Sequence, residues 1–511
     1  MSHRVLAGLL AAAALAATTH AGNVFETPGP LPPPVTRIDQ LVAARWQERG
    51  VRPAALSSDA VFLRRAFLDS TGTLPSASEA AAFLASPDPH KRAALIDSLL
   101  AREEFADYWA LKWSDLLRIK AEFPINLWPN AAQAYYHWIR AAIGANRPYD
   151  RFAADLLTAS GSNFRSPPAN FYRAMQNRDA ADIARIVALT FLGARAEKWP
   201  AAQQANLAAF FSRIGYKETG EWKEEIVYFD ARKPASPVYT FPDGSQIRLR
   251  PSQDPREAFA QWLTAPGNRW FARAIVNRIW YWLLGRGIVE EPDDLRDDNP
   301  PENPALLACL ESELTAGHYD LKHIFRLVMN SQAYQLSALG PPAHFAAYPL
   351  RRLDAEVLAD ALSQITLTSE SYSSSIPEPY TFMPDFERAA TLPDGSISSA
   401  FLELFGRPAR DTGLESERAN RITDEQRLHL LNSTHIQRKL QQSPRLQAMM
   451  REIRDPRELV NQIYLTILSR YPTEDEWKLV QAHSAAGTRG QAAAIDLAWA
   501  LINSTEFLYR H

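Results

Sequence analysis

The stretch Glu103-Glu-Phe-Ala-Asp-Tyr-Trp-Ala-Leu-Lys-Trp-Ser-Asp-Leu-Leu-Arg-Ile-Lys120 decides the fold class of this 511-residue chain. Its large apolar side chains recur at spacings of three and four residues: Phe105, Tyr108, Trp109, Trp113 and Leu116. That spacing places them on one face of an α-helix, and a face so rich in aromatic rings is expected to be buried. The stretch therefore predicts a core helix, and it favours core packing over a cofactor site.

Helical signals continue on both sides of this stretch. Ser57-Ser58-Asp59 supplies an N-cap, and Ser76-Ala-Ser-Glu79 is a capping box. Further helices are expected around residues 91–101, 131–145 and 149–158, so residues 35–215 are interpreted as an N-terminal helical domain.

A small β insert is expected at residues 216–253. Glu225–Asp230 is a strand candidate, and the runs 238–241 and 246–249 flank Asp243-Gly244, which is typical of a β-hairpin turn. Helical patterns return in residues 254–511, the expected C-terminal helical domain, interrupted by a Ser-, Pro- and Thr-rich loop over 368–400. The fold class is therefore predicted as mainly α, multi-helical, with two helical halves and a small β-hairpin insert.

The first 34 residues differ from the rest of the chain. A short positive start, an apolar run from Val5 to Ala17 and Thr19-His20-Ala21 together predict a signal peptide over residues 1–21. Residues 22–34 form a Pro-rich linker. No later stretch is long and apolar enough to span a membrane, so we expect an exported protein, periplasmic or extracellular, with no transmembrane segment in the mature chain.

Charge and cysteine content narrow the classes further. The 55 Lys and Arg against 58 Asp and Glu give a net charge of -3, which does not indicate a nucleic-acid partner. Cys309 is the only cysteine, so no intramolecular disulfide forms. It lies in an amphipathic helical run and is interpreted as a small core residue.

Beyond these patterns, the chain resembles a known family of planctomycete and verrucomicrobial cytochrome-associated proteins. Three segments resemble the family's domain of unknown function 1549: Phe62–Pro75, Tyr108–Arg118 and Asn146–Phe152. Other segments resemble its usual partner, domain of unknown function 1553: Trp262–Asn268, Val276–Trp280, Gly285–Val289, Asn299–Pro301, Ser331–Tyr334, Arg351–Glu356, Leu430–Asn432 and Asn503–Leu508. The resemblance covers nearly the whole chain after the linker, and it implies the domain order but no established activity.

One position departs from this family. In many relatives a helix ending in Phe-Leu-Gly runs into Cys-x-x-Cys-His, which attaches a c-type haem. Here Phe191-Leu-Gly193 is followed by a segment in which Lys198 and Ala201 stand where the resemblance places the cysteines. Covalent haem is therefore excluded at this position, and we expect a short, haem-less branch of the family with no resident cofactor.

An acidic loop, Glu290–Asp298, is the densest cluster of candidate metal ligands. Its carboxylates Asp293, Asp294, Asp297 and Asp298 are oxygen ligands of the kind that calcium prefers, although their spacing does not fit an EF-hand. A solvated loop with helix-capping Asp residues is the favoured interpretation, and calcium binding is the alternative.

Arginines and aromatic residues gather in two stretches that we take as ligand-binding candidates. The candidates are Asn163, Arg165, Arg173, Arg178, Arg407 and Arg410. Aromatic faces beside guanidinium groups hold carbohydrate or carboxylate ligands. Buried pairing of the arginines with carboxylates between helices is the competing interpretation. The nearby loop Ala159-Ser-Gly-Ser162 is a further candidate for anion or sugar contact.

Three functions are compatible with the sequence. The favoured one is a binding or assembly accessory protein of the cell envelope, with a polysaccharide or an envelope protein as its partner, because no recognisable catalytic set is present. The second is a hydrolytic enzyme acting on glycans or esters, which would need two carboxylates about 5–10 Å apart in an aromatic cleft. The third is a redox accessory protein with a noncovalent cofactor. Catalytic residues stay unassigned.

Overall fold

The computed structural model describes residues 26–511 of the chain. The predicted signal peptide and the start of the linker lie outside the described residues. Within residues 26–511, no helix is both long and apolar enough to cross a membrane.

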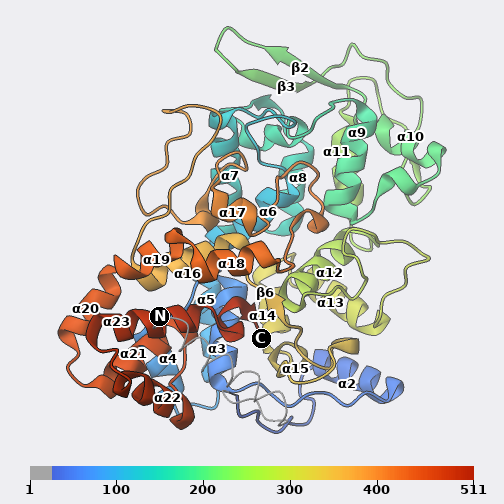
Figure 1. The fold of residues 1–511 in the computed structure, drawn as a ribbon. Helices are drawn as coiled ribbons and strands as arrows, with labels where there is room; N and C mark the ends of the chain where they lie inside the picture. Colours follow the sequence, from blue (N-terminus) through green and yellow to red (C-terminus); the bar gives the residue numbers. More distant parts are fainter. Residues whose placement is uncertain (1–25) are drawn as a thin grey trace.

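The described chain is mainly helical, as predicted (Figure 1). The helices before the β insert are α2 (Arg37–Arg49), α3 (Asp59–Ser70), α4 (Ala77–Ala85), α5 (Lys91–Leu100), α6 (Glu103–Leu116), α7 (Pro129–Gly144), α8 (Tyr149–Leu157), α9 (Ala180–Val187) and α10 (Ala201–Ala209). The next helices are α11 (Pro255–Leu263), α12 (Phe271–Leu284), α13 (Pro304–Ala316), α14 (Leu321–Asn330), α15 (Gln332–Gln335), α16 (Ala355–Thr366) and α17 (Ala400–Leu404). The last are α18 (Asp424–Asn432), α19 (Thr434–Gln441), α20 (Pro444–Glu452), α21 (Pro456–Leu468), α22 (Glu474–Ala485), α23 (Gly490–Ile502) and α24 (Thr505–Leu508).

Local sequence signals account for where these helices begin. The Ser58 side chain accepts a hydrogen bond from the Val61 amide and caps α3. Ser76 and Glu79 form the predicted capping box at the start of α4. The aromatic face of α6 is buried, with Trp109 only 2% exposed, so the prediction of a core helix is confirmed.

The β insert is confirmed, with two strands, β1 and β2, beyond the three that were expected. Strands β2 (Ile214–Glu218) and β3 (Glu225–Phe229) pair antiparallel, and the short strand β1 (Gly161–Ser162) adds to the other edge of β3. Strands β4 (Tyr239–Thr240) and β5 (Gln246–Ile247) form the hairpin around Asp243-Gly244. The stretch that contains Gly161 and Ser162 was expected to be only a loop.

The two helical halves share one continuous hydrophobic core. The Arg64 guanidinium, on α3, donates hydrogen bonds to the carbonyls of Ile467 and Phe507 near the other end of the chain. Strand β6 (Arg351–Arg352) pairs antiparallel with β7 (Tyr509–Arg510). In Figure 1, helix α4 of the first half lies beside α21 and α22 of the second half, and α4 and α21 are in contact.

Candidate functional site

The first group of predicted ligand-binding residues supports the small three-stranded sheet. The Asn163 side chain donates to the Lys223 carbonyl (3.0 Å) and accepts from the Glu225 amide (3.0 Å). Arg173 and Arg178 both donate to one oxygen of Glu225, at 2.7 Å each. Pairing with a carboxylate, which the sequence left as an alternative, therefore describes both arginines, but the partner lies on strand β3 and only Arg173 is buried. Arg165 is different: its side chain is 71% exposed and pairs with Glu221, itself 57% exposed.

The second group, Arg407 and Arg410, lies in the interior. The Arg410 Nε donates to Asp115 at 2.9 Å, and its side chain is fully buried. Arg407 donates to the carbonyls of Ile397 and Asp394. Both guanidinium groups therefore hold the fold together, and neither faces a pocket described below.

Around these arginines lies a larger buried ionic hub. We use this name for the charged side chains Asp69, Lys112, Asp115, Asp354, Glu356, Arg410, Arg418 and Arg510. One carboxylate oxygen of Asp354 accepts from Lys112 (2.9 Å), from the Tyr108 hydroxyl (3.1 Å) and from Arg510 (3.2 Å). Burial alone would raise the pKa of Asp354, but the cations of Lys112, Arg510 and Arg418 hold it well below its usual range.

The acidic loop is neutralised by cations of this chain. Asp293 is buried against Arg278 (2.7 Å), and Asp294 pairs with Lys198 (3.1 Å). Asp298 pairs with Arg296 (3.1 Å), and Asp297 is 94% exposed. Across residues 26–511, no group of three or more His, Cys, Asp or Glu side chains is placed to hold a metal ion. The arrangement therefore gives no support to the calcium alternative.

Lys198, which stands where the resemblance places a haem-attaching cysteine, forms an ion pair with the acidic loop. Lys198 reaches Asp294, and Arg195 reaches Glu291 at 2.7 Å, so two cations face two acids of the loop. The Leu295 amide donates to the Gly193 carbonyl at 2.8 Å and fixes the loop against the end of the preceding helix. This segment therefore carries ion pairs where the resemblance places haem-attaching cysteines.

A polar pocket of about 320 Å³ opens between α7, α8 and the loop that follows α8. Its volume falls in the range of small-molecule sites, roughly 300–1,000 Å³. The lining residues are Trp138, Arg147, Asp155, Thr158, Ala159, Ser160, Ser166 and Pro168. Trp138 stacks on Phe152, with ring centroids 5.2 Å apart and planes at 17°, so the indole is held as a fixed wall.

The charged pair at this polar pocket is Arg147 and Asp155. Arg147 Nη2 lies 2.5 Å from Asp155 Oδ2, and both side chains remain partly exposed, at 43% and 33%. Burial raises the pKa of Asp155, and the positive charge of Arg147 only partly offsets this. A guanidinium and a carboxylate held side by side present donors and acceptors in one plane, which suits a ligand rich in hydroxyl groups.

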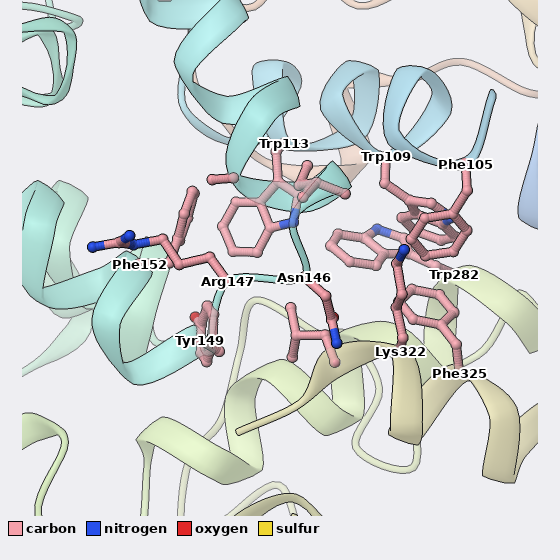
Figure 2. A pocket seen from close by; sticks show the side chains of 13 residues that line it. Phe105, Trp109, Trp113, Asn146, Arg147, Tyr149, Phe152, Trp282, Lys322 and Phe325 are labelled. Carbon is pink, nitrogen blue, oxygen red and sulfur yellow. The ribbon is translucent and has the colours of Figure 1, made fainter. Parts of the chain in front are cut away.

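An aromatic crevice adjoins the polar pocket and shares Arg147 with it (Figure 2). It is lined by Phe105, Trp109, Trp113, Ala142, Ile143, Asn146, Arg147, Tyr149, Phe152, Trp282, Leu321, Lys322 and Phe325. Its open space is only about 30 Å³, too little for a ligand of drug or sugar size. Figure 2 shows the Arg147 side chain directed away from the aromatic rings and Lys322 directed toward them. The crevice therefore extends the polar pocket and is not a second one.

Two polar groups of the aromatic crevice lack protein partners. The Tyr149 hydroxyl is buried and makes no hydrogen bond to any described residue. Lys322 forms no ion pair within the described chain, and its Nζ lies 5.1 Å from the centre of the Phe105 ring. Burial lowers the pKa of Lys322, and the nearby Asp320 carboxylate offsets only part of this effect. Unpaired polar groups at an aromatic opening are typical of a site that binds a ligand or ordered water.

Sequence reasoning missed most of this polar pocket. Only Ala159 and Ser160 lay in a loop flagged for sugar contact, while Trp138, Arg147 and Asp155 were not singled out. The signal was present as an Arg before α8 and an Asp near its end, two turns apart on one face. Arg147 precedes α8, so its distance from Asp155 depends on the backbone path into the helix. The sequence does not specify that path.

Fold and pocket together define a multi-helical protein with one shared core, a small β insert and a ligand-sized polar pocket. Residues 37–218 match the model of a family described as protein of unknown function DUF1549, and residues 255–484 match that of protein of unknown function DUF1553. The chain belongs to the family of proteins that combine these two domains, as the resemblance predicted. No curated protein and no solved structure matches the chain significantly.

Proposed function

We propose that this protein is an exported, non-catalytic accessory protein of the cell envelope that binds a carbohydrate in the polar pocket. The observation that carries the proposal is the fixed Trp138 wall beside the exposed Arg147–Asp155 pair in a space of about 320 Å³. An aromatic face accepts the apolar side of a sugar ring, and the charged pair exchanges hydrogen bonds with its hydroxyl groups.

The hydroxyl-bearing rim of the polar pocket agrees with this ligand class. Ser160 accepts a hydrogen bond from Arg256 at 2.9 Å and keeps its own hydroxyl proton for a ligand. Ser166 also lines the pocket, and no partner of its hydroxyl is found among residues 26–511. The rim therefore adds adaptable donors and acceptors to the fixed wall and the charged pair.

The number of carboxylates in the polar pocket favours binding over hydrolysis. Glycoside hydrolysis uses two carboxyl groups about 5–10 Å apart, one acting as acid and the other as nucleophile or base. Asp155 is the single carboxylate among the lining residues, and the aromatic crevice beside it contributes none. A raised pKa suits Asp155 to donate a proton, but the second group of the pair is not supplied by this pocket.

The proposal is tested by screening purified protein against a glycan array and measuring hits by calorimetry. Trp138→Ala is expected to weaken binding about tenfold, which corresponds to about 1.4 kcal/mol and is reasonable for one aromatic stacking contact. Arg147→Gln is expected to weaken it by a similar factor, since it removes the charged half of the pair. Trp477→Ala, which removes another partly exposed indole, on α22, is the matched control and should bind as the wild type does.

Two outcomes would overturn this proposal. One is the absence of binding to any glycan at millimolar concentration, with the protein shown to be folded by circular dichroism. The other is unchanged affinity in Trp138→Ala. Release of reducing sugar from a bound glycan, abolished in Asp155→Asn, would replace binding by hydrolysis as the function.

A further inference from the structure

Three segments that are distant in sequence meet at the turn of the β2–β3 hairpin. Residues 219–224 form the turn, residues 120–128 precede α7, and residues 374–382 belong to the long loop after α16. The hairpin projects at the end of the molecule away from the C-terminus (Figure 1). The Glu122 carboxylate binds the 374–382 segment by accepting from the hydroxyls of Ser374 (2.9 Å) and Ser375 (2.5 Å).

One aromatic side chain from each segment joins a cluster that we call the aromatic tip, made of Trp128, Trp222, Lys223 and Tyr380. The ring centroids of Trp128 and Trp222 are 4.7 Å apart at 76°, and those of Trp128 and Tyr380 are 5.5 Å apart. The Trp222 and Tyr380 centroids are 5.8 Å apart. Trp222 is 62% exposed although it packs against two rings. The Trp222 indole therefore presents a large face to solvent, and the cluster that supports it is built from three chain segments.

The turn that carries Trp222 is fixed by hydrogen bonds on both of its sides. The Asn163 side chain donates a hydrogen bond to the Lys223 carbonyl and accepts one from the Glu225 amide. The buried Glu224 carboxylate accepts from Ser162 (2.6 Å) and Thr219 (2.7 Å). The orientation of the indole is thus set before any ligand arrives, which reduces the entropy lost on binding.

The polar groups of the aromatic tip are donors without acceptors. The Trp128 indole Nε1 is buried and has no hydrogen-bond partner among the residues described. The Lys223 ammonium lies 5.1 Å and 5.8 Å from the centres of the Trp128 and Trp222 rings, and it forms no ion pair within residues 26–511. A buried N–H without an acceptor is unfavourable, and the exposed Lys223 ammonium is the donor that an outside ligand can reach.

The exposed face of Trp222 and the unpaired ammonium of Lys223 together define the chemistry of the ligand that fits. The ligand needs an apolar face to cover Trp222 and an anionic, acceptor-bearing group within reach of Lys223. A pyranose ring with an acidic substituent has both features. We propose that the aromatic tip is a second carbohydrate site, distinct from the polar pocket, that binds an acidic pyranose ring carrying a carboxylate or a sulfate ester.

The exposed ion pair beside the tip disfavours a membrane surface as the ligand. Arg165 and Glu221 pair at 2.7 Å next to Trp222, and both are largely exposed. Inserting Trp222 into a bilayer would remove water from this charged pair. A sugar ring can instead lie on the indole while this pair stays hydrated.

The proposal is tested by calorimetry on the intact protein with oligogalacturonate, a sulfated carrageenan oligosaccharide and a neutral cello-oligosaccharide. We expect an acidic oligosaccharide to bind at least tenfold more tightly than the neutral one, and the two acidic probes distinguish carboxylate from sulfate recognition. Trp222→Ala is expected to weaken the acidic ligand at least tenfold. Lys223→Gln is expected to abolish the preference for the acidic ligand over the neutral one.

Matched variants separate this site from general effects and from the polar pocket. Tyr471→Ala, which removes an aromatic side chain 45% exposed near α22, should bind all three probes as the wild type does. Trp138→Ala should leave binding at the tip intact, so loss of the polar-pocket site and loss of the tip are distinguishable. Unchanged affinity in Trp222→Ala, no preference for acidic probes, or binding to phosphatidylglycerol vesicles in their place would each overturn the proposal.

Discussion

The buried ionic hub and the polar pocket use the same kinds of residue in opposite ways. In the hub, the Asp354 carboxylate has partners on both oxygens, with Asn420 donating to the second at 3.0 Å. Arg418 bridges Glu356 (2.6 Å) and Asp115 (2.5 Å). At the polar pocket and the adjoining aromatic crevice, Asp155 has a single partner, and the Tyr149 hydroxyl has none among the described residues.

This difference shows that the number of partners, and not the residue type, separates a structural charge from a ligand-binding one. Arg407 and Arg410 looked like ligand-binding arginines in the sequence, yet both side chains are buried and donate to protein groups, with one nitrogen of each left without an acceptor among the described residues. Removing a partner from a saturated buried group is costly, whereas removing an unsatisfied group is not. The comparison therefore makes predictions that differ in sign and size between the two regions.

The largest effect is expected for Asp354→Ala, in the hub. The change leaves Lys112 and Arg510 buried without their shared carboxylate, and breaking a buried pair in this way costs about 3–5 kcal/mol. Urea unfolding measures the loss. Asp297→Ala is the control, because that carboxylate is 94% exposed and should change stability by less than about 0.5 kcal/mol. Equal losses in the two variants would remove the distinction that we draw.

A pH effect of comparable size is expected from Asp360, a buried carboxylate on α16 that accepts from the amides of Ala389 and Ala390. Burial raises its pKa to about 6, from an ordinary value of 3.8. The folded state therefore holds this proton more tightly than the unfolded state, so the associated stability is present below about pH 4 and is lost as the pH rises through 6. Two pKa units correspond to about 3 kcal/mol.

The measurement for Asp360 is the free energy of unfolding from about pH 3 to pH 8 in the wild type and in Asp360→Asn. The difference between the two curves should change across pH 4–6 and stay constant above pH 7. A constant difference throughout would show that Asp360 does not titrate in this window. It would also show that the Asp360 carboxylate, with its two amide donors, stays ionised despite its burial.

The smallest effect, and the sharpest comparison, comes from two tyrosines. Tyr108 donates to Asp354 and accepts from Arg510 (2.8 Å), so Tyr108→Phe should cost about 1–3 kcal/mol. Tyr149 is equally buried but makes no hydrogen bond to a described residue, so Tyr149→Phe should be neutral or slightly stabilising. Thermal unfolding of both variants measures this. A comparable loss in Tyr149→Phe would mean that ordered water already satisfies its hydroxyl.

Much of the fold followed from local sequence patterns. The three- and four-residue spacing in α6, the cap at Ser58 and the Asp243-Gly244 turn each act over a few residues, and each is found where it was expected. Strand β1 was missed because two residues carry no periodicity, and Gly161 pairs with Val227 across a long separation. Such pairing depends on tertiary structure, which a local pattern does not contain.

The candidate site was less predictable than the fold. Aromatic and arginine content identified residues with the right chemistry, but it could not count their partners. Arg410 finds Asp115 across 295 positions, and Trp222 meets Tyr380 through a loop that sequence described only as rich in Ser, Pro and Thr. Asn163 was flagged for ligand contact, and it instead fixes the turn that carries Trp222.

The hydrogen bonds that join α3 to the C-terminal end of the chain can form only late in its synthesis. Arg64 finds its two acceptors 403 and 443 positions further along, so its guanidinium cannot be satisfied by a chain that is still short. Contacts of such separation slow folding, because a long loop must close before they form. A growing chain of this protein therefore completes the hydrogen bonds of Arg64 only when nearly all of it has been made.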